Sequence, residues 1–328
     1  MNWYKHIYVF SLTILGAIVF IGCQKEINID IPDAEQKLVI EGTIEADGVN
    51  PTPPVVMLTK SQGYFEPTGA SALENIFVHN ATVSVRVDNI VYPLEELCLD
   101  NLDSTFALIA ADFLGISSDD FGSFNYCIYT VPLADLIANN YLYGEIGKTY
   151  ELTVVSEGVT YTSSTLIPAL IPLDSVWFQT QGSDTAGFAW ARLTDPPELG
   201  NAYRWKARRI NLNSEGKTKD NQFIVPANSV FEDKFVNGVG FDFGYDRGLV
   251  TNDEPTDVPR YFKTNDTIAI KFCSIDFDVY KFLRIYEVEA SSGGSPFSSP
   301  TTIPTNITGG ALGLWAGYSV TFDTIYGY

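Results

Sequence analysis

The sequence predicts a mainly β protein with two β-sandwich-like domains, formed by residues 37–168 and 172–328. Runs in which apolar and polar residues alternate recur in both parts, as expected of strands that bury one face. Turn-forming segments separate several of these runs at short intervals, which favours hairpins. Prolines cluster in "LIPALIPLDS", where they disfavour helix and weaken strand pairing, so this segment is predicted to separate the domains.

The first 22 residues are predicted to be a lipoprotein signal peptide. A lysine precedes an apolar run of about 15 residues, which is shorter than the roughly 20 needed to cross a bilayer as a helix. The run ends at Gly22-Cys23, which resembles a bacterial lipobox, with Phe20 and Ile21 in place of its usual Leu and small residue. Cys23 is the predicted lipidation site and residues 23–36 a polar tether. The alternative is an ordinary signal peptide that contains a cysteine.

Four segments define the strands of the first domain. "KLVIEGTIEAD" and "PPVVMLTKS" are each predicted to form one strand. "ATVSVRVDNIVYPL" predicts a hairpin around Asp88-Asn89, and "KTYELTVVSEGVTYTSSTLIP" predicts another around Ser156-Glu157-Gly158. The spacing of these strands is typical of an immunoglobulin-like sandwich.

Residues 95–145 are predicted to be an insertion in this domain, and "LDSTFALIAADFLGISSDDFG" within them has a partly helical pattern. Cys98 and Cys127 bracket that stretch. Because disulfides persist in exported proteins, we favour a bridge between these two cysteines, with three free thiols as the alternative. Cys273, in the strand-like "TIAIKFCSI", is predicted to be a small buried apolar residue.

The second domain is predicted to contain further strands and one short helix. Its alternating runs are "DSVWFQT", "GFAWARLTDPP", "NAYRWKARRINLN", "DTIAIKFCSI" and the tail "GALGLWAGYSVTFDTI". Residues 237–259 are rich in Gly and Asp and are predicted to form a long loop. The helix is predicted to begin after Asp276 and to stop at Gly293-Gly294. Its apolar residues at helical spacing are Phe277, Tyr280, Leu283 and Tyr286.

The chain is strongly acidic, with a formal net charge of −20 at pH 7. Nucleic acids and anionic lipid surfaces attract Lys/Arg patches, so the composition argues against both as partners. Acidity also keeps an exported protein soluble. No spacing of Cys and His predicts a metal site, and no motif predicts a cofactor.

Hydrolase motifs are absent: the sequence contains no G-x-S-x-G elbow, no H-E-x-x-H and no P-loop. His79 is the sole histidine after the signal peptide, at a predicted strand entrance where a surface or edge role is the common one. Two carboxylates are enough to hydrolyse a glycoside, but no pair stands out among 40 acidic residues. We therefore predict a protein that is not an enzyme.

Two acidic segments offer the oxygen ligands that calcium prefers. Neither has the ligand spacing of an EF-hand, so solvated loops are the favoured interpretation and calcium binding is the alternative. The acids are Asp119 and Asp120 in "SSDDFG", and Asp242, Asp246, Asp253 and Asp257 in "FDFGYDRGLVTNDEPTD".

Tryptophans of the second domain could stack on a sugar or peptide ligand. They all lie in strand-like runs, where packing in the core is the more common role. These residues are Trp177, Trp190, Trp205 and Trp315.

A basic cluster, "RWKARR", stands out in this acidic chain. Strand alternation puts Arg204, Lys206 and Arg208 on one face, and puts Trp205 and Ala207 on the other. Arg209 completes the cluster. One interpretation is a site for an anion or an acidic partner, and the other is a solvated or ion-paired face.

A series of segments along the mature chain resembles a known family. They are "CQKEINIDIPDAEQKLVIEGTI", "VMLTKSQGYF", "VHNATVSV", "GKTYELTVVSEGVTYTSSTLIP", "LIPLDSVWF", "LTDPPELGNAYRWK" and "SPFSSPTTIPTNITGGALGLWAGY". In this order they resemble the domain-of-unknown-function 4249 lipoproteins of Bacteroidota. Ser295 stands where the family pattern often has Asn.

The resemblance implies an outer-membrane lipoprotein, on the periplasmic face or the cell surface, of a kind commonly encoded beside TonB-dependent receptors. It supplies no catalytic residues. We expect a non-enzymatic binding or accessory component of a TonB-dependent receptor in nutrient uptake, without cofactor. The alternatives are a structural or envelope-assembly lipoprotein and a carboxylate-based glycan hydrolase.

Overall fold

The computed structural model describes residues 35–47, 52–63, 76–102, 126–182, 185–249, 253, 257–292 and 302–327. Contacts group Gln36–Tyr328 into one compact unit. Several predictions lie outside the described residues: the signal peptide with Cys23, most of the tether, the partly helical stretch with Asp119 and Asp120, and the stop at Gly293-Gly294.

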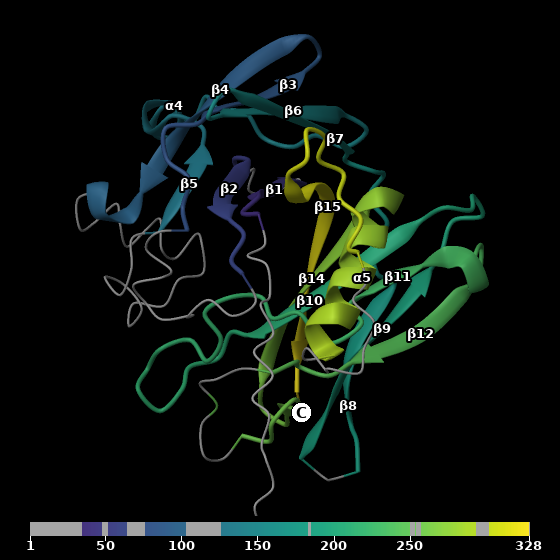
Figure 1. Cartoon of the computed structure of the whole chain (residues 1–328). Helices are drawn as coiled ribbons and strands as arrows, with labels where there is room; N and C mark the ends of the chain where they lie inside the picture. Colours follow the sequence, from purple (N-terminus) through teal and green to yellow (C-terminus); the bar gives the residue numbers. More distant parts are fainter. Residues whose placement is uncertain are drawn as a thin grey trace, which may run out of the picture. The chain divides into compact units, whose positions relative to one another are not determined.

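The prediction of a mainly β fold is confirmed (Figure 1). The larger sheet contains β1 (Leu38–Ala46), β2 (Val55–Lys60), β3 (Thr82–Val87), β4 (Ile90–Cys98), β5 (Cys127–Thr130), β6 (Thr149–Ser156), β7 (Val159–Leu166), β10 (Ala202–Arg209), β11 (Val230–Glu232), β14 (Thr267–Ile275) and β15 (Leu312–Tyr326). The smaller sheet contains β8 (Ser175–Thr180), β9 (Ala186–Thr194), β12 (Gly240–Tyr245) and β13 (Phe262–Lys263). Among the described residues, the helices are α4 (Leu133–Ile137) and α5 (Phe277–Ser292), with short 3-10 turns at Leu99–Asn101 and Asp233–Phe235.

The order of the larger sheet is β11-β10-β14-β15-β1-β2-β5-β4-β3-β6-β7, and in the smaller sheet β9 pairs with β12, β13 and β8. Near the middle of the larger sheet, β1 pairs in parallel with β15, and these are the first and last strands of the described chain. One sheet therefore runs through both predicted domains, and the division into 37–168 and 172–328 stays a prediction.

Both predicted hairpins of the first half are present. Asp88 and Asn89 have φ values of 49° and 65° between β3 and β4, and Glu157 and Gly158 have φ values of 51° and 79° between β6 and β7. Two consecutive residues with positive φ give a turn whose twist matches that of the strands, and Asn, Asp and Gly tolerate this conformation best. Local turn chemistry thus sets the register of both hairpins.

Part of the predicted insertion at 95–145 belongs to the larger sheet. Strand β4 continues to Cys98, and residues 95–98 pair with β5. The start of the predicted insertion and its segment 127–130 thus belong to the sheet, because strand pairing satisfies their backbone groups. Between these two strands, residues 103–125 lie outside the described part of the chain.

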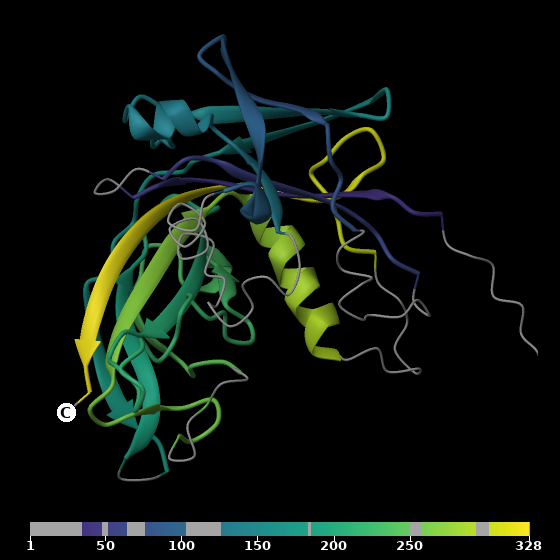
Figure 2. The same ribbon diagram turned by 90° about the vertical axis from the view of Figure 1, so that its left-hand side faces the viewer.

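Two separate apolar cores lie along one face of β15, and a third lies on its other face. In the first half, β3 and β6 pack over β1 and β15, and Val83, Val154, Ile44 and Trp315 share one cluster. In the second half, the smaller sheet covers one face of β10 and β14. The yellow strand β15 in Figure 2 curves along its length, past both cores. Packed sheets of this kind agree with the sandwich-like prediction.

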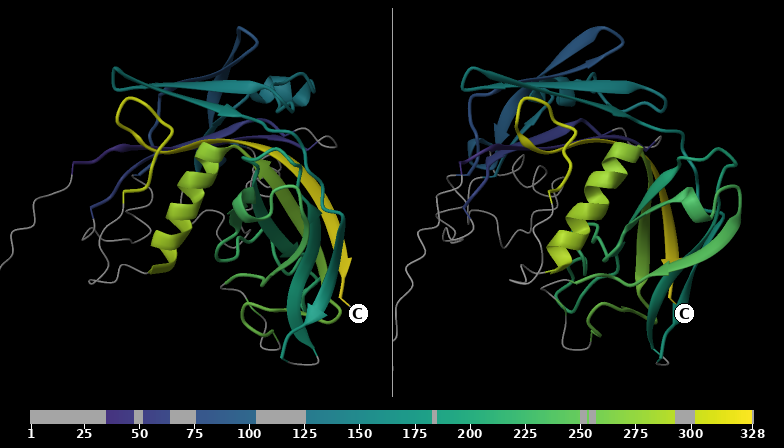
Figure 3. Two further views of the ribbon diagram at one scale, coloured as in Figure 1. Left: turned by 90° about the vertical axis from the view of Figure 1, so that its right-hand side faces the viewer. Right: turned by 45° about the vertical axis from the view of Figure 1, so that its right-hand side comes forward.

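Helix α5 covers the opposite face of β10, β14 and β15 (Figure 3). The helix begins after Asp276, as predicted, and this residue caps it: the Asp276 Oδ1 atom accepts hydrogen bonds from the backbone N–H groups of Asp278 and Val279, each at 2.9 Å. Val279 and Leu283 bury against Cys273 and neighbouring strand residues. In the described part of the chain, no helix is both long enough and apolar enough to span a bilayer.

The prediction of a long loop at 237–259 is wrong where strand β12 forms. Phe241, Phe243 and Tyr245 alternate toward the core beneath the smaller sheet, and β12 pairs with β9 along its length. The Gly and Asp residues that suggested a loop lie on the other face of this strand. Aromatic burial at every second position outweighs their low strand propensity.

Candidate functional site

The basic residues predicted to share one face of β10 do so. Tyr203, Trp205, Ala207 and Arg209 are buried on one side, and the side chains between them are half-buried on the other. Strand β14 adds Lys271, whose register partner on β10 is Lys206. We call Arg204, Lys206, Arg208 and Lys271 the basic face.

One acid from a distant part of the chain partly neutralises the basic face. The Lys271 ammonium lies 2.6 and 2.8 Å from the two carboxylate oxygens of Glu45 on β1. Burial opposes ionisation of Glu45, but attraction by Lys271 and Lys206 lowers its pKa. Lys271 and Glu45 therefore form a largely buried ion pair, with side chains 13% and 17% exposed.

The arginines of the basic face are held by neutral partners. The Arg204 Nη1 atom donates to the hydroxyl of Tyr318 at 2.9 Å. The Arg208 guanidinium lies 4.9 Å from the ring centroid of Phe223, and its Nη1 atom donates to the carbonyl oxygen of Asn221 at 3.2 Å. The Nε atoms of both arginines are buried and have no hydrogen-bond partner among the described residues. The positive charges thus keep unused hydrogen-bonding capacity.

Lys206 is the least satisfied member of the basic face. Its Nζ atom lies 5.3 Å from the ring centroid of Tyr318, and it forms no ion pair or hydrogen bond with any described residue. Burial, together with repulsion by Arg204 and Lys271, lowers the pKa of Lys206 to about 8. Like charges directly opposite each other across a strand pair destabilise a sheet. An anion bound beside Lys206 would remove that cost.

The acidic loop predicted to be solvated, or to bind calcium, instead supplies partners for arginines. The pairs are Asp242 with Arg192, Asp246 with Arg260, Asp253 with Arg247, and Asp257 with Arg209, at N–O distances of 2.6–2.8 Å. Asp257 and Arg209 are each 1% exposed in their side chains, so this pair is buried, not solvated. Carboxylates that converge on guanidinium groups are already occupied, which disfavours the calcium interpretation.

The four tryptophans divide between two environments. Trp205 and Trp315 are 0% exposed and belong to the cores, as predicted. Trp177 and Trp190 are half-buried register partners on β8 and β9, and their rings stack with centroids 6.2 Å apart. This stacked pair stabilises the β8–β9 hairpin in the way that aromatic cross-strand pairs usually do.

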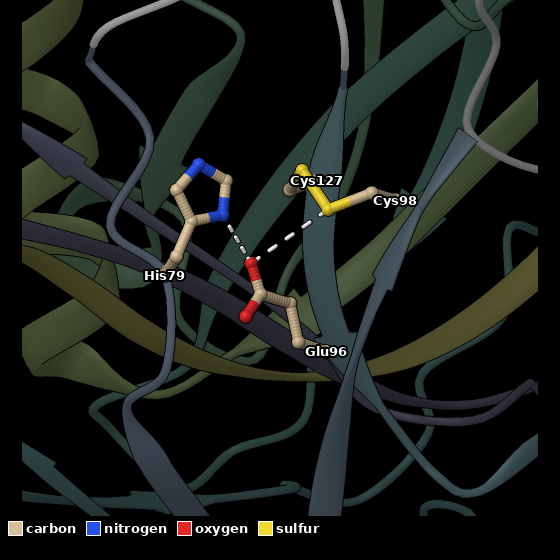
Figure 4. Close-up of side chains that lie close together, drawn as sticks. All are labelled: His79, Glu96, Cys98 and Cys127. Atoms are coloured by element: carbon tan, nitrogen blue, oxygen red, sulfur yellow. Dashed lines mark hydrogen bonds and ion pairs between the residues drawn. A yellow bond between two sulfur atoms is a disulfide. The ribbon is translucent and has the colours of Figure 1, made fainter. Parts of the chain in front are cut away.

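The predicted disulfide between Cys98 and Cys127 is present, and it joins register partners of β4 and β5. Cys273 is buried without a disulfide, as predicted. Beside the disulfide, the Nδ1 atom of His79 is hydrogen-bonded to the Oε1 atom of Glu96, and the Cys98 Sγ atom lies 3.6 Å from that oxygen (Figure 4). No sequence spacing signals this group, because its members come from three separate segments.

An open pocket that no sequence motif signals lies beside the 3-10 turn at Asp233–Phe235 and strand β12. Its volume is about 590 Å³, and its walls are mainly aromatic. The rings of Phe231, Phe241, Phe243 and Tyr245 line it, with the acids Glu232 and Asp246. The sequence could not predict this pocket, because residues 237–259, which include β12, were expected to form a loop.

The fold and these sites define a mainly β protein with two packed sheets, one disulfide and a half-buried basic face. The chain belongs to the family described as "Domain of unknown function (DUF4249)", which matches residues 24–323. The predicted family resemblance is therefore confirmed.

No curated protein matches the chain. Among solved structures, it is similar to the "Fcho1 Mu homology domain (Danio Rerio) with bound Eps15 peptide", at 9% identity over 88% of this chain and 95% of that one. The TM-score of 0.17 is too low for this likeness to carry any argument.

Proposed function

We propose that this protein is a lipid-anchored, non-enzymatic binding component of a TonB-dependent uptake system at the outer membrane. The support for the anchor is the apolar leader that ends at Gly22-Cys23. The support for the uptake role is the family resemblance. Tethering through the segment 23–36 would raise the local concentration of the binding sites at a receptor.

The observation that carries the binding role is the charge balance around Lys206. Arg204, Lys206 and Lys271 lie together. Glu45 pairs with Lys271 and Glu287 of α5 attracts Arg204, so Lys206 is the charge of the three that is left without a paired acid. A half-buried excess of positive charge is costly unless an anion approaches it. Guanidinium and ammonium groups together suit a carboxylate or phosphate ligand, because both anions accept several charge-assisted hydrogen bonds. The ligand class we propose is therefore a small anion carrying carboxylate or phosphate groups.

Calorimetric titration with citrate and with inorganic phosphate tests this binding role. We expect saturable binding of at least one probe to the wild-type protein, and binding weaker by about tenfold or more in Lys206→Met, since one buried charge-assisted contact is worth about 1.5–3 kcal/mol. Lys281→Met is the matched control, because Lys281 lies on α5 with its side chain 49% exposed. Equal binding by Lys206→Met and the wild type, or no binding of either probe, would overturn the assignment.

The anchor and the partner need separate measurements. Mass spectrometry of the protein from native membranes should show a diacylglycerol thioether on Cys23 that is absent in Cys23→Ala. Purification in a mild detergent should recover a β-barrel receptor with the wild-type protein. An unmodified amino terminus would exclude the anchor, and recovery without any receptor would exclude the uptake role, whatever the result of the anion titrations.

A further inference from the structure

Four potential metal ligands converge at the disulfide end of β4 and β5. One donor atom from each of His79, Glu96, Cys98 and Cys127 lies within 4.8 Å of all the others. Figure 4 shows the imidazole of His79, the carboxylate of Glu96 and the two sulfur atoms directed toward one another. The residues lie up to 48 positions apart, so tertiary structure alone brings them together.

Backbone contacts fix the position of each donor. Cys98 and Cys127 are register partners, and Glu96 lies two residues before Cys98, on the same face of β4. The segment that carries His79 is held by an isolated bridge between Thr59 and Phe77 and by a 2.9 Å hydrogen bond from the Val78 N–H group to the Leu58 carbonyl oxygen. The group therefore rests on sheet pairing, which holds its geometry.

The second oxygen of Glu96 is also held. The Asn80 N–H group donates to the Glu96 Oε2 atom at 2.9 Å, which leaves the Oε1 atom directed at His79 and Cys98. Outer contacts of this kind orient the ligands in metal sites. The side chains of His79 and Glu96 are 46% and 21% exposed, so an ion can reach them from solvent.

The oxidation state of the cysteines decides what this group can bind. Sulfur ligates zinc as a thiolate, so the two bonded sulfurs of the disulfide are unsuitable ligands. Reduction would provide two thiolates beside an imidazole nitrogen and a carboxylate oxygen. Four such donors form the tetrahedral type of set that zinc accepts.

We propose that the dithiol form of this protein binds one zinc ion through His79, Glu96, Cys98 and Cys127. Disulfide and zinc would then be alternative cross-links between β4 and β5. A dithiol reductant breaks the S–S bond, donates two electrons and two protons to the sulfurs, and itself becomes a disulfide. Zinc then displaces the two thiol protons into solvent. The Nδ1 atom of His79, which donates its proton to Glu96 in the oxidised form, passes that proton to solvent while Nε2 takes one up, so that the Nδ1 lone pair becomes free to bind the metal.

Cobalt(II) substitution is a direct test, because thiolate ligation of tetrahedral cobalt gives intense charge-transfer and d–d absorption. The full chain is reduced with dithiothreitol, desalted without oxygen, and titrated with cobalt and then with zinc. We expect one cobalt per chain, displaced by zinc, and no absorption with the oxidised protein. Failure of the reduced wild-type protein to bind either ion would overturn the proposal.

Variants identify the ligands. His79→Ala and Glu96→Gln should each weaken zinc binding by about 10–100-fold or more, judging from the cost of disturbing metal sites. Glu95→Gln is the matched control, because Glu95 is an exposed neighbour on the opposite face of β4. Unchanged affinity in both His79→Ala and Glu96→Gln would show that the cysteines bind zinc with other partners and would overturn the assigned ligand set.

Thermal unfolding provides an independent readout. Zinc should raise the Tm of the reduced protein and leave the Tm of the oxidised protein unchanged. The oxidised form of each variant is its own folding control, because the disulfide holds β4 and β5 together there. Equal zinc stabilisation of the oxidised and reduced proteins would contradict a site made by the two thiolates.

Discussion

The indole ring of Trp315 lies against the backbone of Gly42, its register partner on the neighbouring parallel strand. A Cβ atom on Gly42 would lie 2.6 Å from the Cε3 atom of that ring. The indole Nε1 atom also donates to the carbonyl oxygen of Tyr150 on β6, at 3.0 Å. Trp315 thus connects the pairing of β1 with β15 to strand β6, which packs over it, and only glycine leaves room for its ring.

Gly42→Ala should therefore destabilise the protein. Overpacking of this kind costs about 1–3 kcal/mol, more than the smaller gain from restricting the unfolded chain. Urea unfolding followed by tryptophan fluorescence measures the change in the free energy of unfolding. In a double-mutant cycle with Trp315→Leu, the cost of Gly42→Ala should shrink, because the ring is gone. An undiminished cost in that background would mean that the indole is not the cause.

Lys206→Met should stabilise the protein at pH 7 by about 2 kcal/mol, because it removes a half-buried charge. Burial and repulsion by Arg204 lower the pKa of Lys206 to about 8, which shows that this charge is unfavourable in the folded protein. Denaturant unfolding at pH 7 measures the difference. Lys281→Met, at an exposed position, should change stability by no more than about 0.5 kcal/mol.

The pH dependence of the same variant checks its cause. Between about pH 8 and pH 10.5 the unfolded chain holds a proton on Lys206 that the folded chain has lost, so this group makes folding more favourable as pH rises. The advantage of Lys206→Met should be full below pH 8 and should shrink above it. The other charged or titratable groups that face Lys206 are present in both the wild type and the variant, so the comparison isolates Lys206. These groups are Arg204, Lys271, Cys273, Tyr318 and Glu45. A constant difference from pH 7 to pH 10 would contradict this assignment.

Arg209→Met should destabilise the protein strongly. Arg209 is 1% exposed and contacts Asp220 and Asp257, which are each 1% exposed as well. Removing the cation takes away the closest partner of both buried carboxylates and leaves them ion pairs of 3.7–3.8 Å with Arg247 and Lys263, at a cost of about 3 kcal/mol. Arg192→Met removes a guanidinium from an exposed pair with Asp242 and should cost only about 0–1 kcal/mol. Chemical denaturation of both variants compares the two pairs, and similar losses would mean that burial is not decisive.

Asp276→Ala should cost about 1–2 kcal/mol. This residue caps α5, and its Oδ2 atom also accepts hydrogen bonds from the Thr165 hydroxyl at 3.1 Å and the Leu166 N–H group at 3.3 Å. Asp276→Asn keeps a capping oxygen and should recover most of the loss. Thermal unfolding of both variants measures the effect. If Asp276→Asn lost as much as Asp276→Ala, the negative charge rather than the cap would be responsible.

Local sequence patterns predicted the elements that depend on neighbouring residues. The hairpin at Asp88-Asn89 and the helix after Asp276 are examples, because turn conformation and capping are decided within a few positions. Strand β12 escaped prediction, since its outer Gly and Asp residues suggest a loop and only tertiary burial of Phe241 and Phe243 makes it a strand.

The candidate sites were predictable only in part. Strand alternation placed Arg204, Lys206 and Arg208 together, but nothing in the sequence shows that Lys271 lies opposite Lys206 or that Glu45 arrives from β1. The disulfide could be inferred from compartment and cysteine spacing, whereas its proximity to His79 depends on packing of separate segments. Sequence thus predicts which residues share a strand face, and the sheet order decides which faces meet.

The pairing of β1 with β15 has a consequence for the biosynthesis of the chain. A ribosome makes Leu38–Ala46 long before Leu312–Tyr326, so the middle of the larger sheet stays open until β15 has been made. Until then β1 and β14 both present an unpaired edge, which invites aggregation and proteolysis. Nonsense mutations that remove β15 should therefore eliminate the protein altogether, whereas a chain that folds from its amino terminus onward would keep its earlier part.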